Sequence, residues 1–583
     1  MTGGPDGLSQ PAHEVSMRFD VKVPMRDGVT LSTDIYLPAI DQPVPVVLIR
    51  TPYNNNNEAI VHDCMYFAAR GYGVVTQDVR GRWDSDGDWY PFVHEAEDGF
   101  DTMEWVGRQA WCNGNIGTAG GSYVAMVQWQ AAPLRSRFLK AMVPRVGYSD
   151  FYHNWVYTGG AFQFAFNLRW GAIQMSTRTN QVQYLWLPGA NHLSALHWHL
   201  PLNAMDAKAG RASQVWQDWI AHPDYDDYWR RMRPVEAYYA DVAVPAYGIG
   251  GWYDVFLQST LNNFMGVRAH GRPPGRQHQK IIIGPWIHDC GHMGLDTHTG
   301  DVDFGNAARV DLMAEHVRWF DHWLKGRDTG IAAEPPVNVF VMGANRWRQA
   351  DDWPLPGTTY VSYYLHSQGG ANSLFGDGVL DSNPPTAEPP DRYTYDPEQP
   401  VPTVGGSTCC SEDVTPVSMG PRDQQPVEWR PDVLVYTSAP LDDDLEVTGP
   451  VRMTLYAASD APDTDFTAKL VDVHPDGSAI NVAQGIIRAR YRDSWETPSL
   501  LEPGRVYAYP IDLWSTSNCF RQGHRIRVEV ASSNFPQFDR NPNTGHPFGQ
   551  DAMLRKARQT VHHDGEHQSH ILLPVVPTVH ARG

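Results

Sequence analysis

The sequence is short of basic residues and of cysteine, and each shortage excludes a class of protein. Lys and Arg total 46 against 66 Asp and Glu, which gives a net charge of −20. A chain this acidic is unsuited to the phosphate backbone, so no nucleic-acid partner is expected. Six cysteines at irregular positions do not form a disulfide framework. We therefore expect reduced thiols, and we expect the adjacent residues Cys409 and Cys410 not to pair with each other.

Long apolar runs are also missing. The opening residues, M-T-G-G-P-D-G, are polar and turn-rich, unlike a signal peptide. No apolar stretch is long enough to cross a bilayer, so no membrane partner is expected. These observations predict a cytoplasmic protein.

Aromatic residues, in contrast, are plentiful, with 21 Trp, 26 Tyr and 20 Phe in a chain that is 42% hydrophobic. This composition is typical of an ordered globular protein. A length of 583 residues is too great for one hydrophobic core, which predicts two or three domains.

The first half of the chain has the pattern of an α/β domain. A hairpin is expected at 20–40, and buried strands then alternate with helical stretches. The first expected strand begins at 44, and the others lie at 73–78, 116–120, 139–144, 245–252 and 280–286. The expected helices lie at 58–70, 95–108, 123–132, 257–268 and 310–325. Such alternation predicts a mostly parallel sheet covered on both faces.

Two other regions break this alternation. Residues 146–240 are aromatic and helix-forming, which predicts a helical cap inserted into the α/β domain. After Gly326, short alternating runs such as V-N-V-F-V-M and V-R-M-T-L-Y-A predict an antiparallel β-sandwich of the jelly-roll type. The expected division is 1–145 and 241–330 for the α/β domain, 146–240 for the cap and 331–583 for the sandwich.

Three polar residues follow strands of the predicted sheet in an order typical of serine hydrolases. Ser122 follows I-G-T-A-G-G, Asp254 ends G-I-G-G-W-Y-D, and His288 ends I-I-I-G-P-W-I-H. A serine hydroxyl attacks a carbonyl only when a base takes its proton and a third group orients that base. On an α/β-hydrolase sheet the three follow in the order Ser, Asp, His. The alternatives are a helix N-cap for Ser122, a second helix cap for Asp254 and a core histidine for His288.

The segment around Ser122 departs from the usual G-x-S-x-G pattern. Val124 stands where the second glycine is expected, and Ala125 follows it. A small side chain is needed near this position because the helix approaches the strand closely. We expect Ala125 to supply it.

Longer motifs carry a family resemblance. These are R-T-P-Y (50–53), Q-D-V-R-G (77–81), W-C-N-G-N-I-G (111–117), G-G-S-Y (120–123), G-W-Y-D (251–254), G-P-W-I-H (284–288), D-T-D-F-T-A-K-L-V-D-V (463–473) and S-S-N-F-P (532–536). In these motifs the sequence resembles the cocaine-esterase-like branch of the X-prolyl dipeptidyl-peptidase family, which also includes α-amino acid ester hydrolases. The resemblance implies an α/β-hydrolase fold with an inserted helical cap and a C-terminal jelly roll. It also suggests a homodimer.

The same resemblance implies the machinery of acyl transfer. Ser122 is expected to be the nucleophile, His288 the base and Asp254 its partner. The oxyanion hole would combine the backbone N–H of Tyr123 with the phenol of Tyr53. No metal and no cofactor is expected.

The resemblance also bears on the substrate. In the α-amino acid ester hydrolases an acidic pair after the catalytic aspartate helps to bind the substrate ammonium, but here Phe256 and Leu257 follow Asp254. Cocaine-esterase-like enzymes line the acyl pocket with aromatic residues, and Trp155, Trp170 and Phe256 occupy matching positions. We therefore expect a small-molecule ester with an aromatic or aliphatic acyl group. These aromatic residues could equally form the core of the cap.

Other functions remain open at this point. The same triad could cleave amides, as an acylase or a dipeptidyl peptidase does. The segment W-I-H-D-C-G-H (286–292) carries four possible metal ligands, His288, Asp289, Cys290 and His292, so a zinc hydrolase is a rival hypothesis. A carbohydrate-binding protein with a decayed hydrolase domain is a third.

Overall fold

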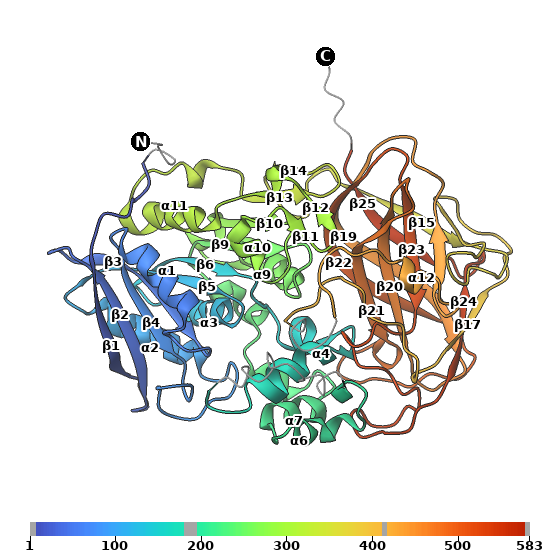
Figure 1. Ribbon diagram of the computed structural model, residues 1–583, viewed down its shortest axis with the longest axis horizontal. Coiled ribbons are helices and arrows are strands. Elements are labelled where there is room, and N and C mark those ends of the chain that lie inside the picture. The colour runs from blue at the N-terminus through green and yellow to red at the C-terminus, as the bar shows by residue number, and fades with distance from the viewer. Residues whose placement is uncertain (1–6, 180–194, 411–416, 578–583) are drawn as a thin grey trace, which may run out of the picture.

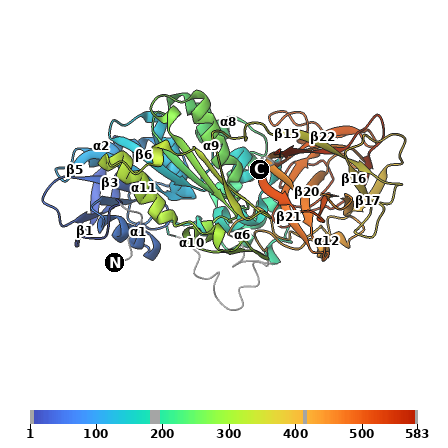
Figure 2. The same ribbon diagram turned by 90° about the horizontal axis from the view of Figure 1, so that it is seen from above.

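Two large sheets stand at opposite ends of the molecule, with a helical region between them (Figure 1). The computed structural model describes residues 7–179, 195–410 and 417–577. Viewed from above, the α/β region lies at one end of the longest axis and the all-β region at the other, and the cap shares the middle with part of the α/β region (Figure 2). The polypeptide passes from the α/β region into the cap, returns to the α/β region, and then enters the all-β region.

The first sheet has ten strands in the order β1-β2-β4-β3-β5-β6-β9-β10-β13-β14. Their bounds are β1 Val15–Pro24, β2 Thr30–Pro38, β3 Val44–Thr51, β4 Gly73–Asp78, β5 Cys112–Gly121, β6 Leu139–Arg145, β9 Ala246–Gly251, β10 Gln279–Gly284, β13 Val337–Val341 and β14 Arg346–Ala350. The strands from β4 to β13 in this order are parallel. Every residue of β3, β4, β9 and β10 is buried, as expected where helices cover both faces of a parallel sheet. The predicted α/β fold class is confirmed.

Helices cover both faces of this sheet. They are α1 Glu58–Ala68, α2 Glu95–Gly107, α3 Tyr123–Ala131, α9 Leu257–His270 and α11 Leu312–Lys325, with the short α10 Cys290–Gly294 after β10. The boundaries of α11 have clear local causes. The Asp311 side chain accepts a hydrogen bond from Ala314 N, and Gly326 ends the helix with a φ of 66°.

The run V-N-V-F-V-M was expected in the β-sandwich, and that prediction is wrong. It forms β13, which pairs in parallel with β10 and is followed by the antiparallel strand β14. The first sheet therefore continues to Ala350, beyond the expected boundary at 330. The half-buried Asn338 is the one polar residue of β13, whose other four residues are buried. A strand toward the edge of an α/β sheet and a sandwich strand look alike in that respect.

The cap is mainly helical, as predicted for 146–240, but it also contains a small hairpin. Its described elements are η2 Tyr152–Val156, β7 Tyr157–Thr158, β8 Ala161–Phe162, α4 Phe164–Asn167, η3 Leu168–Gln174, η5 Leu202–Ala204, α6 Met205–Lys208, α7 Gln214–Ala221, α8 Asp227–Arg231 and η6 Val235–Asp241. The aromatic residues of the cap form one core cluster with residues of the α/β region.

The C-terminal region is all-β apart from short helical turns, and its eleven strands form one hydrogen-bonded set. They are β15 Thr359–His366, β16 Val379–Asp381, β17 Asp391–Tyr395, β18 Leu434–Thr437, β19 Leu445–Ser459, β20 Asp465–Val473, β21 Ala479–Arg488, β22 Tyr507–Phe520, β23 Arg525–Ala531, β24 Ala557–His562 and β25 His570–Val575. The pairing is antiparallel except between β16 and β18.

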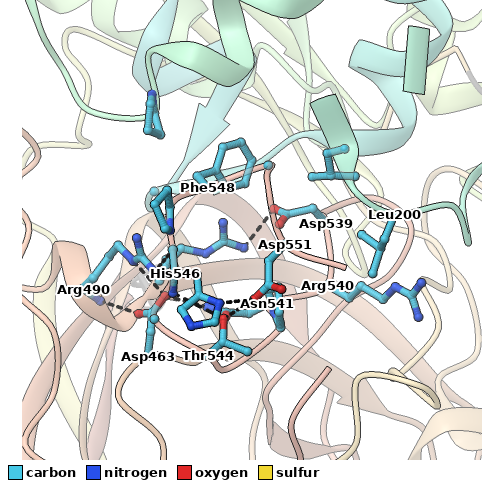
Figure 3. A pocket seen from close by; sticks show the side chains of 18 of the residues that line it. Leu200, Asp463, Arg490, Asp539, Arg540, Asn541, Thr544, His546, Phe548 and Asp551 are labelled. Carbon is cyan, nitrogen blue, oxygen red and sulfur yellow. Dashed lines mark hydrogen bonds and ion pairs between the residues drawn. The ribbon is translucent and has the colours of Figure 1, made fainter. Parts of the chain in front are cut away.

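A buried ion-pair network joins the cap to the all-β region. Arg488 donates to both oxygens of Asp465 and to Asp539 Oδ1, each at 2.9 Å, and all three side chains are almost fully buried. The same oxygen of Asp539 accepts the backbone N–H of Phe162 in the cap hairpin. Figure 3 shows Asp539 and the neighbouring pair Arg490–Asp463 around a small cavity at this joint. The network therefore fixes the position of the cap hairpin.

Glycines allow the hairpin to approach closely. A Cβ on Gly159 would lie 1.8 Å from the carbonyl oxygen of Ile486, and a Cβ on Gly160 would lie 2.2 Å from the ring of Tyr491. Both glycines also have positive φ. The cap therefore docks by backbone contact as well as by charge.

Within the described residues, no helix is both long enough and apolar enough to cross a membrane.

Replacing Arg488 by alanine should destabilise the protein strongly, because the carboxylates of Asp465 and Asp539 would remain buried without their cation. We expect a loss of about 3–5 kcal/mol in the free energy of unfolding, measured by urea denaturation. The control is Arg505→Ala, which removes an exposed pair with Glu502 and should leave the midpoint of urea denaturation unchanged. Equal effects from the two variants would show that the joint does not depend on this network.

Candidate active site

Ser122 lies on a sharp turn between the end of β5 and the start of α3. Its φ of 60° and ψ of −130° are unusual for a residue other than glycine, and its side chain makes no capping hydrogen bond to the helix. The backbone holds this conformation, since Ser122 N donates to Arg145 O at 3.0 Å and Ala125 N donates to Ser122 O at 2.9 Å. The hydroxyl is therefore free of the helix, which argues against the N-cap alternative.

The residues around the turn explain the departure from the usual motif. Gly120 has a φ of 131°, and a Cβ there would lie 2.1 Å from Cγ1 of Val124. Val124 thus fills the space that the missing side chain of Gly120 leaves. Ala125 lies under Gly147, where an added Cβ would be only 2.9 Å from the alanine methyl. The expected role of Ala125 as a small packing residue is consistent with this contact.

His288 bridges the other two polar residues. Its Nε2 is 3.0 Å from Ser122 Oγ, and its Nδ1 is 2.8 Å from Asp254 Oδ1. Asp254 is fully buried, whereas the His288 side chain is 13% exposed. The structure thus brings together the three residues predicted from chain order. This geometry can transfer a proton from the serine to an imidazole that the carboxylate orients.

Two donors lie beside Ser122. Tyr123 is the first residue of α3, so its backbone N–H has no acceptor within the helix. The Tyr53 hydroxyl accepts a hydrogen bond from Trp170 Nε1 at 2.9 Å, which leaves its own proton available. Burial raises the pKa of the Tyr53 phenol, although the bonds to Trp170 and Ser122 and nearby arginine charges act to lower it. The phenol therefore remains a neutral donor.

The ring of Tyr123 is anchored by residues that the sequence analysis missed. Its hydroxyl donates to Glu95 Oε1 at 2.7 Å, and Glu95 forms a buried ion pair with Arg50 at 3.1 Å. Burial raises the pKa of the Glu95 carboxyl, which Arg50 and Tyr123 act to lower. Arg50 lies in the motif R-T-P-Y, but no local pattern links it to a glutamate 45 residues away.

The three predicted substrate-binding residues lie close together and close to the triad. Ring centroids are 5.3 Å apart between Phe256 and His288, 5.0 Å between Phe256 and Trp155, and 4.8 Å between Trp155 and Trp170. All three side chains are at most 3% exposed and belong to the core that the cap shares with the α/β region. They therefore pack the cap, and they also form an aromatic wall beside the imidazole.

A cavity of about 340 Å³ opens on Ser122, His288 and Tyr53. Two helices that the sequence analysis predicted but did not link to the site also line it, through Ile60 and Asp63 of α1 and Met313 and His316 of α11. Arg145 lines it as well. Trp155, Trp170 and Phe256 are not among its lining residues. A second cavity, at the joint of Figure 3, measures only about 30 Å³ and is lined by none of the triad residues.

The four possible metal ligands of W-I-H-D-C-G-H point to different places. Asp289 accepts the backbone N–H of Gly291, Cys290 is fully buried, and His292 lies beside Asp296 with 83% of its side chain exposed. His288, Asp289 and Cys290 line the same cavity, but among the described residues no three of these four side chains form a group that could hold a metal ion. The structure therefore gives no support to a zinc centre built from this segment.

The prediction that adjacent cysteines would not pair is wrong. Cys409 and Cys410 form a disulfide, while the other four cysteines are free and buried. Cys410 has a φ of 61°, which departs from the extended backbone that would direct neighbouring side chains to opposite sides. The pair lies near His288.

Comparison with known proteins agrees with this geometry. A model of the X-Pro dipeptidyl-peptidase (S15 family) matches residues 27–289, and a model of the X-Pro dipeptidyl-peptidase C-terminal non-catalytic domain matches residues 329–572. Cocaine esterase of Rhodococcus sp. (strain MB1 Bresler) is 38% identical over 96% of this chain and 99% of its own. The chain belongs to the cocaine-esterase branch of this family. The relatives of this chain include this cocaine esterase and a protein named a putative serine esterase. This protein is a serine ester hydrolase.

Solved structures support the assignment over the whole chain. An aminopeptidase from the marine sediment archaeon Thaumarchaeota archaeon has a TM-score of 0.83 at 28% identity, covering 99% of this chain and 98% of its own. An α-amino acid ester hydrolase has a TM-score of 0.81 at 27% identity, covering 99% of both chains. Structural relatives of this chain therefore include proteins named for different activities.

The turn at Ser122 predicts a sharp difference between two neighbouring glycines. Gly120→Ala should abolish labelling of Ser122 by a fluorophosphonate probe, because the new methyl would collide with Val124 at a positive φ. Gly121→Ala is the matched control, since its Cβ would meet nothing closer than 3.5 Å, and it should label like the wild type. Full labelling of Gly120→Ala would show that the turn does not need glycine.

Proposed function

We propose that the protein hydrolyses carboxylic esters of small molecules through an acyl-enzyme formed on Ser122. The observation that carries this proposal is the His288 ring, which lies between Ser122 Oγ at 3.0 Å and Asp254 Oδ1 at 2.8 Å. Membership of the esterase branch supports the same reaction class.

The reaction follows from the positions of the protons. Ser122 Oγ attacks the ester carbonyl while His288 Nε2 accepts its proton. Asp254 accepts the Nδ1–H of the ring and stabilises the imidazolium that results. His288 then protonates the leaving alcohol, and a water molecule activated by the same nitrogen releases the acid from the acyl-enzyme.

The tetrahedral oxyanion is stabilised by the Tyr123 N–H and the Tyr53 hydroxyl. Trp170 holds the Tyr53 oxygen from the other side, so the phenol proton needs no reorientation during the reaction. A donor that is fixed before the reaction stabilises the transition state more than one that must be ordered during it.

The surroundings of the triad favour a neutral ester. Phe256 and Leu257 are buried directly after Asp254 and offer no carboxylate to an ammonium group. The cavity wall carries Asp63 and Asp289 together with Arg145, and Asp289 already accepts the backbone N–H of Gly291. We place the ester in the 340 Å³ cavity that opens on Ser122, His288 and Tyr53, while Phe256, backed by Trp155 and Trp170, packs against the His288 ring.

A series of p-nitrophenyl esters tests this function. The wild type should release p-nitrophenol from acetate through benzoate, and Ser122→Ala should fall to the buffer rate because the proposed acyl-enzyme forms on the Ser122 hydroxyl. Comparison of kcat/KM across the series reports the preferred acyl group. Equal rates for the two proteins would exclude Ser122 as the nucleophile.

If the Tyr53 phenol donates to the oxyanion, its loss should affect the chemical step selectively. Tyr53→Phe should lower kcat by about 100- to 1,000-fold, the typical cost of losing one oxyanion donor, with little change in KM. Trp170→Phe keeps the phenol but removes the donor that orients it, and its kcat should fall by less. An unchanged kcat in Tyr53→Phe would remove this residue from the oxyanion hole.

Amide hydrolysis is the second candidate, because one of the similar solved structures is named an aminopeptidase. Matched p-nitroanilide and p-nitrophenyl substrates with the same acyl group separate the two activities. A kcat/KM for the anilide equal to or above that for the ester would favour the amidase.

A further inference from the structure

The disulfide between Cys409 and Cys410 lies at the catalytic histidine. The two sulfur atoms and a ring nitrogen of His288 lie within 4.8 Å of one another. Both cysteines come from the all-β side of the sequence, 121 residues or more after His288. Cys409 is 1% exposed and belongs to the same core cluster as Phe256.

The chain is anchored at Gly406 and Gly420, on either side of the segment that carries the cysteines. Gly406 and Gly420 exchange backbone hydrogen bonds of 2.7 and 3.1 Å, and Ser407 O accepts Gln537 Nε2 at 3.0 Å. Gly406 has a φ of 91°, which favours glycine at this position. These contacts hold the chain directly before the two cysteines.

The three side chains offer a ligand set for a soft cation once the disulfide is open. A two-electron reduction by a dithiol converts the disulfide into two thiols, and the dithiol becomes a cyclic disulfide. Cysteine thiolates and a neutral imidazole are the ligands that Zn²⁺ prefers, and three protein ligands suffice for a site with one open position. Binding then releases the two thiol protons.

The imidazole nitrogen available to such a cation is the one used in catalysis. Nδ1 of His288 is held by Asp254, which leaves Nε2, the atom 3.0 Å from Ser122 Oγ. A cation on Nε2 and proton transfer from Ser122 exclude each other.

We propose that reduction of Cys409–Cys410 creates, together with His288, a binding site for a thiophilic divalent cation such as Zn²⁺, and that the cation switches the hydrolase off. The binding site follows from the three ligands alone. The inhibition rests on the proposed role of His288 as the general base.

Co²⁺ is the probe for binding, because thiolate ligands give it intense charge-transfer absorption. The full-length protein is reduced with dithiothreitol, freed of reductant under argon and titrated with Co²⁺. The reduced wild type should develop the absorption at one equivalent, and the oxidised protein should not. Absence of the absorption in the reduced wild type would overturn the proposal.

Zn²⁺ inhibition of p-nitrophenyl acetate hydrolysis is the second readout. One equivalent of Zn²⁺ should lower the rate of the reduced wild type by about 100-fold or more, the usual contribution of a general base, and a chelator should restore it. The oxidised protein should keep its rate. Equal inhibition of both forms would contradict a site that depends on reduction.

Single variants Cys409→Ser and Cys410→Ser should lose both the absorption and the Zn²⁺ sensitivity while keeping ester hydrolysis. Cys519→Ser, which removes a buried free thiol of β22, is the matched control and should behave like the wild type. Ser122→Ala should be inactive and still bind Co²⁺, so a failure of the esterase assignment is distinguishable from a failure of the metal site. Unchanged Co²⁺ spectra in both single cysteine variants would place the ligands elsewhere.

Discussion

The left-handed backbone of Ser122 is the constraint on which the rest of the site depends. A φ of 60° is unfavourable for a residue with a side chain, so contacts with the surrounding residues must stabilise it. They do so through the carbonyl of Arg145, the first turn of α3 and the contact between Gly120 and Val124. One turn thereby directs the Ser122 hydroxyl away from its own helix and toward His288, and leaves the Tyr123 N–H unpaired beside it. An extended or helical serine could not do both.

Much of the fold could be predicted because its signals are local. Continuous apolar runs mark strands that are buried on both faces, and the structure places β3, β4, β9 and β10 where those runs occur. The carboxyl ends of parallel strands share one edge of a sheet, so polar residues that follow three such strands meet in space. That rule brought Ser122, Asp254 and His288 together without any knowledge of distances.

The remainder depends on contacts between residues far apart in the chain. No local pattern shows that Glu95 accepts a hydrogen bond from Tyr123, or that α1 and α11 line the cavity. The run that forms β13 predicts a sandwich strand, and only its pairing with β10 assigns it to the first sheet. Because Cys409 and Cys410 are adjacent, the sequence predicts no bond between them. The disulfide forms where the backbone at Cys410 has a positive φ.

The all-β region matches a domain that is called non-catalytic. It nevertheless contributes to the enzyme, because its residues hold the cap. Every triad residue precedes residue 289, yet the cap hairpin is held by Asp539 and Arg488. The ribosome therefore completes the catalytic residues hundreds of residues before it delivers the groups that fix the cap above them. The hydrogen bond that holds the cap hairpin therefore cannot form until Asp539 has been synthesised.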